Sequence, residues 1–125
     1  MKVVFFSESG IVGKVDRTFP NARNDIAWSI MMDADWCPYG KQPTDHYDLG
    51  VVTIPKTKPN LDIDLFRQYC DKIVVMQEGP HWYFQDYSVE QQFQFIENLR
   101  KADWVWCHNK SDVSYYEGLG CEDVR

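Results

Sequence analysis

The chain has 125 residues, of which 44% are hydrophobic, and its formal net charge at pH 7 is −6. This length suits one domain with a single core, and the apolar content excludes an intrinsically disordered chain. The acidic balance gives no long-range attraction to nucleic acid or anionic lipid, so we do not expect nucleic acid as a partner.

The cysteines and the N-terminus predict a cytoplasmic protein. The four cysteines are Cys37, Cys70, Cys107 and Cys121. They are widely spaced and form no C-x-x-C pair, which is typical of reduced thiols in the cytosol. The apolar run that follows Lys2 is too short for a signal-peptide core or a membrane span.

Apolar runs without polar alternation predict four strands. They lie near residues 2–6, 48–54, 72–77 and 103–107. Such runs are typical of parallel strands that are buried on both faces. At the centre of the core we expect Phe5, Val52, Val74 and Val105.

Helix signals lie between the first three predicted strands. Asn21 or Asn24 can cap a helix that continues through Ala34 and ends before Cys37. A short helix is predicted to begin near Asn60, where acidic residues suit a helix N-terminus.

Two further helices flank the last predicted strand. Ser88 and Gln91 have the spacing of a capping box, and Ser111 can cap a final helix. Strand and helix therefore alternate four times, which predicts one three-layer, Rossmann-like α/β domain with a mostly parallel sheet over residues 1–125.

The loop after the first strand contains Gly10, Gly13 and Lys14. Its spacing matches neither the phosphate loop G-x-x-x-x-G-K-[ST] nor the dinucleotide motif G-x-G-x-x-G. Two interpretations stay open: a plain surface loop, or a ligand loop that uses backbone N–H groups together with Lys14 or Arg17.

The third strand is followed by a stiff turn, Glu78-Gly79-Pro80-His81. Ligands bind at the carboxyl ends of strands in open parallel sheets, so Glu78 and His81 are candidate catalytic residues that can bind hydroxyls or move a proton. Trp82 can stack on a ligand ring. The alternatives are that Glu78 caps a helix or pairs with a cation, that His81 packs beside Trp82, and that the aromatic loop folds onto the core.

His108 and Asn109 follow the last strand directly and are candidate substrate-binding residues. Asn109 can instead serve only the turn before the next helix. We expect Gly10, Gly13, Glu78, His81 and His108 along one rim of the sheet. A zinc site at Cys107 and His108 is rejected because paired ligand spacing is lacking, and no G-x-S-x-G elbow is present for a serine hydrolase.

Two segments resemble the N-terminal domain of GT-B glycosyltransferases, enzymes with two Rossmann domains that use nucleotide sugars. They are Gln77-Glu78-Gly79-Pro80-His81 and the run from Lys101-Ala102-Asp103 through Trp104-Val105-Trp106 to Cys107-His108-Asn109. The resemblance implies that this domain holds the acceptor, that Gly10 and Gly13 approach the phosphates of the donor, and that His81 lies in the cleft between the domains.

The resemblance also implies a donor-binding domain or partner chain that this sequence lacks, so we expect the chain to be the N-terminal part of a two-domain enzyme. We expect neither a metal nor a separate cofactor. The alternative is a non-catalytic, flavodoxin-like or Rossmann-like module that binds a ligand.

Overall fold

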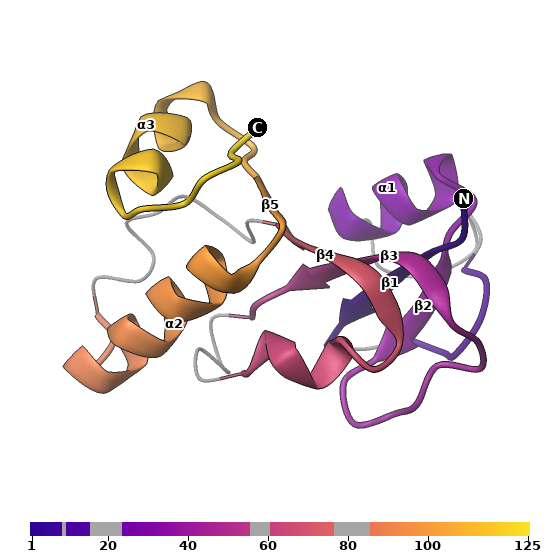
Figure 1. Ribbon diagram of the computed structural model, residues 1–125. Coiled ribbons are helices and arrows are strands. Elements are labelled where there is room, and N and C mark those ends of the chain that lie inside the picture. The colour runs from indigo at the N-terminus through magenta and orange to yellow at the C-terminus, as the bar shows by residue number, and fades with distance from the viewer. Residues whose placement is uncertain (9, 16–23, 56–60, 77–85) are drawn as a thin grey trace.

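A computed structural model describes residues 1–8, 10–15, 24–55, 61–76 and 86–125 (Figure 1). Its strands are β1 (Val3–Ser7), β2 (Asp35–Pro38), β3 (Tyr47–Thr53), β4 (Cys70–Met76) and β5 (Trp104–Trp106). They form one all-parallel sheet with the order β2-β1-β3-β4-β5. The predicted Rossmann-like α/β fold is confirmed.

Three α-helices and a 3-10 helix accompany the sheet in the described residues. They are α1 (Asn24–Met31), η1 (Ile63–Phe66), α2 (Val89–Lys101) and α3 (Lys110–Gly118). The capping box of α2 is present, with Gln91 N–H donating to the Ser88 hydroxyl. The last helix begins at Lys110 with Asn109 at the cap position, two residues earlier than a Ser111 cap requires.

The prediction that one helix continues through Ala34 was wrong. The helix α1 ends at Met31, and Asp33 turns the chain with a positive φ of 51°. After Ala34 the chain forms β2, in which Trp36 and Cys37 are buried against β1. Burial of Trp36 in the sheet outweighed the helical spacing of the apolar residues before it.

The core has two parts, one on each face of the sheet. On one face, α1 packs on the sheet through Ile26, above Phe5 and Val74. The opposite face carries Val52 and Val105, together with buried side chains of η1, α2 and α3. All four residues predicted for the core centre are at most 1% exposed, so this prediction is confirmed.

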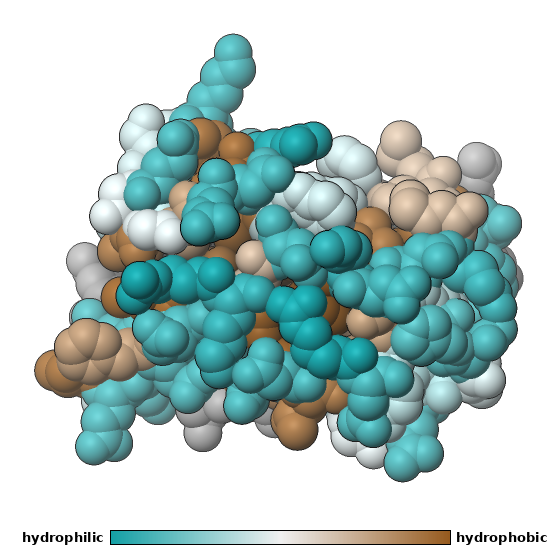
Figure 2. All heavy atoms as spheres, viewed as in Figure 1, coloured by the Kyte–Doolittle hydropathy of each residue, from teal (hydrophilic) through white to brown (hydrophobic). Residues whose placement is uncertain are grey.

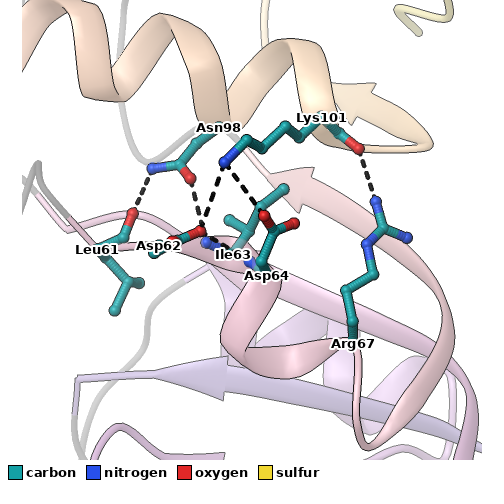
Figure 3. Close-up of polar contacts among 7 residues, drawn as sticks. All are labelled: Leu61, Asp62, Ile63, Asp64, Arg67, Asn98 and Lys101. Atoms are coloured by element: carbon teal, nitrogen blue, oxygen red, sulfur yellow. Dashed lines mark hydrogen bonds and ion pairs between the residues drawn. The ribbon is translucent and has the colours of Figure 1, made fainter.

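A polar network joins η1 to α2 on the second face (Figure 3). The buried Asn98 side chain accepts a hydrogen bond from the Ile63 N–H at 3.1 Å and donates to the carbonyl of Leu61. Lys101 pairs with Asp64 at 3.1 Å. The network satisfies backbone groups next to η1 that would otherwise be buried without partners.

The outer edge of β5 is paired with the residues that follow α3. Val105 N–H donates to the carbonyl of Asp123, and Arg125 N–H donates to the carbonyl of Val105, both at 2.9 Å. Val105 and Val124 form a parallel bridge. This pairing places Arg125 beside β5.

The surface in the view of Figure 1 is mostly hydrophilic, with hydrophobic side chains in separate small patches (Figure 2). Among the described residues, no helix has the length and apolar character needed to cross a membrane.

Candidate ligand pocket at the carboxyl edge of the sheet

A row of side chains crosses the carboxyl edge of the sheet on the α1 face. Thr53 of β3 pairs with Met76 of β4, which pairs in turn with Trp106 of β5. Phe6 of β1 pairs with Val52 of β3, so the next residues of these strands, Ser7 and Thr53, lie side by side. Since alternate residues of a strand point to opposite faces, these four side chains share the face on which α1 lies.

The β1 end of this row is polar and buried. The Ser7 hydroxyl donates to the carboxylate of Asp25 at 2.8 Å, and both residues are at most 4% exposed. The Thr53 hydroxyl is also buried and has no hydrogen-bond partner among the described residues. This hydrogen bond joins the first turn of α1 to the end of β1.

The β5 end of the row opens into a pocket of about 280 Å³. Its walls come from α1, from the ends of β4 and β5, and from the residues after them: Trp28, Met76, Trp106, Cys107, His108 and Arg125. The two indole rings are tilted by 40°, with centroids 6.2 Å apart. The Trp28 side chain is 45% exposed, so one side of this aromatic pair faces solvent.

A second hollow of about 250 Å³ continues from this pocket toward the amino ends of the strands. It is lined by Met1, Asp48, Leu49, Lys72, Trp104, Trp106 and Arg125. Trp106 and Arg125 line both hollows.

Among the described residues, few polar groups line the pocket. Burial, assisted by the nearby Asp112 and Cys121, raises the pKa of the Cys107 thiol to about 12. The thiol therefore stays protonated at neutral pH and is a poor nucleophile. The Arg125 guanidinium is paired with the Asp123 carboxylate at 3.0 Å, which offsets its charge. His108 supplies an imidazole at the wall.

The predicted site residues fall in different places. His108 lines the pocket. Gly10 and Gly13 both have a positive φ, near 115°, and Gly13 pairs with Trp36 of β2 through two backbone hydrogen bonds. Since β2 and β5 are the two outer strands of the described sheet, the structure does not bring Gly13 and His108 together.

The structure gives Lys14 ion-pair partners and places Asn109 at the start of a helix. Lys14 forms ion pairs with Asp33 at 3.2 Å and Asp35 at 3.4 Å. Slight burial lowers the pKa of Lys14, but the hydrogen bonds and negative charge of Asp33 and Asp35 raise it more. Asn109 occupies the cap position of α3 without a side-chain cap bond. Binding by either residue stays a prediction.

Glu78, His81 and Trp82 lie outside the described residues, so their predicted roles stay predictions. The sequence argument missed Trp28, Met76, Trp106 and Arg125. Trp106 stands two residues before His108, and this adjacency was the available signal. Across the described residues, no three His, Cys, Asp or Glu side chains gather as metal ligands.

No family model, curated protein or solved structure matches this chain significantly.

Proposed function

We propose that this domain binds a small molecule at the carboxyl edge of its sheet, as the acceptor-side domain of a glycosyltransferase that takes sugar from a nucleotide-sugar donor. The observation that carries the proposal is the pocket where β4 and β5 end, which Trp28 and His108 line. Open parallel α/β sheets bind ligands at this edge.

The segment that resembles GT-B enzymes fits around this pocket. Asp103 precedes β5, and its carboxylate accepts hydrogen bonds from the Ile73 N–H and from Arg67, both at 2.8 Å. These bonds tie the start of β5 to β4. The polar turn at the other end of β5 brings His108 to the pocket wall. The aspartate thus supports the strand, and the histidine is the residue of this segment that can meet a substrate.

The chemistry assigned to the domain is acceptor binding and proton transfer. An imidazole can accept a proton from an attacking acceptor hydroxyl at neutral pH, and both His108 and the predicted catalytic His81 carry one. The resemblance assigns most donor contacts to a second domain, so residues 1–125 alone should transfer little or no sugar.

The competing proposal is a binding module without catalysis. The same pocket supports it, because a cavity that holds a ligand does not by itself require a reaction. Enzyme turnover distinguishes the two proposals.

The test uses the polypeptide encoded by the complete reading frame that contains this sequence. It is incubated with UDP, GDP and dTDP sugars and an acceptor mixture, and release of the nucleotide is measured. We expect release that depends on acceptor, a decrease of roughly tenfold or more for His81→Ala, and little release by residues 1–125 alone.

Three outcomes count against the proposal. No release with any donor would contradict glycosyl transfer, and unchanged turnover of His81→Ala would remove His81 from the mechanism. Efficient transfer by residues 1–125 alone would contradict the need for a second domain.

A further inference from the structure

We propose that the pocket formed by Trp28 and Trp106 binds a flat aromatic ring, and that the acceptor is an aromatic compound that carries a hydroxyl group. The assignment of the ring to the acceptor rests on the proposed function. The binding itself does not require catalysis.

The size of the pocket limits its occupant. Its volume of about 280 Å³ is at the lower end of ligand cavities, which span roughly 300–1,000 Å³. A single ring with a small substituent fits this space better than a whole nucleotide or an oligosaccharide.

The arrangement of the indoles sets the binding mode. With their centroids 6.2 Å apart and a tilt of 40°, the rings of Trp28 and Trp106 contact each other and leave no slot between them. A ligand ring therefore lies against their exposed side, where Met76 completes the apolar wall. Aromatic pairs gain about 0.5–1.5 kcal/mol beyond the area that they bury, and a thioether beside a ring adds a favourable contact.

The lining disfavours a sugar ring or an anion in this position. A sugar carries several hydroxyls, and each one that is buried without a partner costs about 1–3 kcal/mol. Three of the lining side chains are Trp28, Met76 and Trp106, the Cys107 thiol is a weak hydrogen-bonding group, and Arg125 is already paired with Asp123. An aromatic acceptor has one polar group that needs a hydrogen-bond partner, its hydroxyl. His108 lines the pocket and is the partner that we propose for this hydroxyl.

The experiment compares three compounds that each carry one hydroxyl group and differ in the group attached to it: phenol (the phenyl compound), cyclohexanol (the cyclohexyl compound) and methanol (the methyl compound). Dissociation constants are measured by isothermal titration calorimetry on the 125-residue chain without a donor. We expect the phenyl compound to bind at least about tenfold more tightly than the methyl compound, with the cyclohexyl compound between them.

Substitutions then locate the binding. Trp28→Ala and Trp106→Ala should each weaken the binding of phenol by roughly fivefold or more, and Trp28→Phe should keep most of it. Phe93→Ala is the matched control, because Phe93 is an aromatic residue of α2 that is 65% exposed. It should leave binding unchanged. Circular dichroism verifies the fold of each variant. If Trp106→Ala unfolds, the change in binding of the Trp28→Ala variant alone tests the site.

The outcomes separate this inference from the proposed function. Equal affinity for the phenyl and methyl compounds, equal affinity for the phenyl and cyclohexyl compounds, or unchanged binding in the Trp28→Ala variant would overturn the aromatic site. Sugar transfer only to acceptors without an aromatic ring would overturn the assignment of the aromatic ring to the acceptor, while it would support glycosyl transfer. Selective binding of the phenyl compound supports the site even if no transfer is found.

Discussion

The two faces of the sheet are covered to different extents in the described structure. On the face of α2, buried side chains from η1, α2 and α3 cover the strands and form the larger core cluster. On the other face, α1 is the one helix among the described residues, and Trp104 and Trp106 remain partly buried at the β5 side.

We infer from this difference that the two faces of the sheet have different roles. Both faces of a parallel sheet are usually covered, so the partly exposed tryptophans beside the pocket support our proposal that a ligand binds there. The face of α2 should therefore determine the stability of the fold. The β4 and β5 side of the other face should determine binding.

The largest effect is expected from truncation of a buried ring on the face of α2. Phe6 is 1% exposed and its ring centroid lies 4.3 Å from that of Phe66. Phe6→Ala should lower the free energy of unfolding by about 3–5 kcal/mol, because it removes apolar burial and leaves a cavity. Urea denaturation measures this change. A loss below about 1 kcal/mol would contradict the claim that the face of α2 determines the stability of the fold.

The second effect concerns the polar network of Figure 3. Asn98→Ala leaves the Ile63 N–H and the Leu61 carbonyl without their side-chain partner, in a position where Asn98 is fully buried. We expect a loss of about 2–4 kcal/mol, since each buried unpaired group costs about 1–3 kcal/mol. Glu97→Ala, an exposed neighbour on α2, is the control and should change unfolding by less than about 0.5 kcal/mol.

A smaller effect that depends on pH is expected at Asp103. Burial alone would raise the pKa of this carboxyl group, but the Ile73 N–H and the Arg67 guanidinium lower it more, so the native pKa lies below the ordinary value. A lowered native pKa gives stability above the unfolded pKa, about 3.9, and this stability is lost as the pH falls through the native pKa.

Asp103→Asn should therefore cost about 1 kcal/mol at pH 7, a modest value because the Arg67 side chain is 34% exposed and solvent screens the pair. The difference between the two proteins should shrink below about pH 4. Urea denaturation from pH 7 to pH 3 measures it, and a difference that grows as the pH falls would contradict the assigned sign.

The smallest stability effect is expected on the other face. Trp28 is 45% exposed, so Trp28→Ala should change the free energy of unfolding by about 1 kcal/mol or less. Unfolding of this variant under conditions where Glu97→Ala is stable would show that the indole supports the fold rather than a ligand.

The sequence predicted the parts of the fold that carry continuous apolar runs. The strands that became β1, β3 and β4 are such runs, and Ser88 with Gln91 marked the start of α2. The strand β2 was missed because it is four residues long and follows a helical pattern without a glycine or proline between them.

The pocket was predicted only in part for a similar reason. His108 was identified because it follows a strand, and a position after a parallel strand fixes the edge of the sheet. Trp28 belongs to α1 and Trp106 to β5, and periodicity along the sequence does not tell which strand a distant helix covers. Their contact depends on the strand order, which only the folded sheet reveals.

The most direct measurement of the central claim is NMR of the indole N–H groups during titration with phenol. Trp28 and Trp106 line the pocket, whereas Trp36 on the same face is 1% exposed. We predict saturable shifts of the Trp28 and Trp106 signals, with the Trp36 signal unchanged. A saturable shift of the Trp36 signal without shifts of the Trp28 and Trp106 signals, or no shifts at all, would contradict the assignment of ligand binding to the pocket on the face of α1.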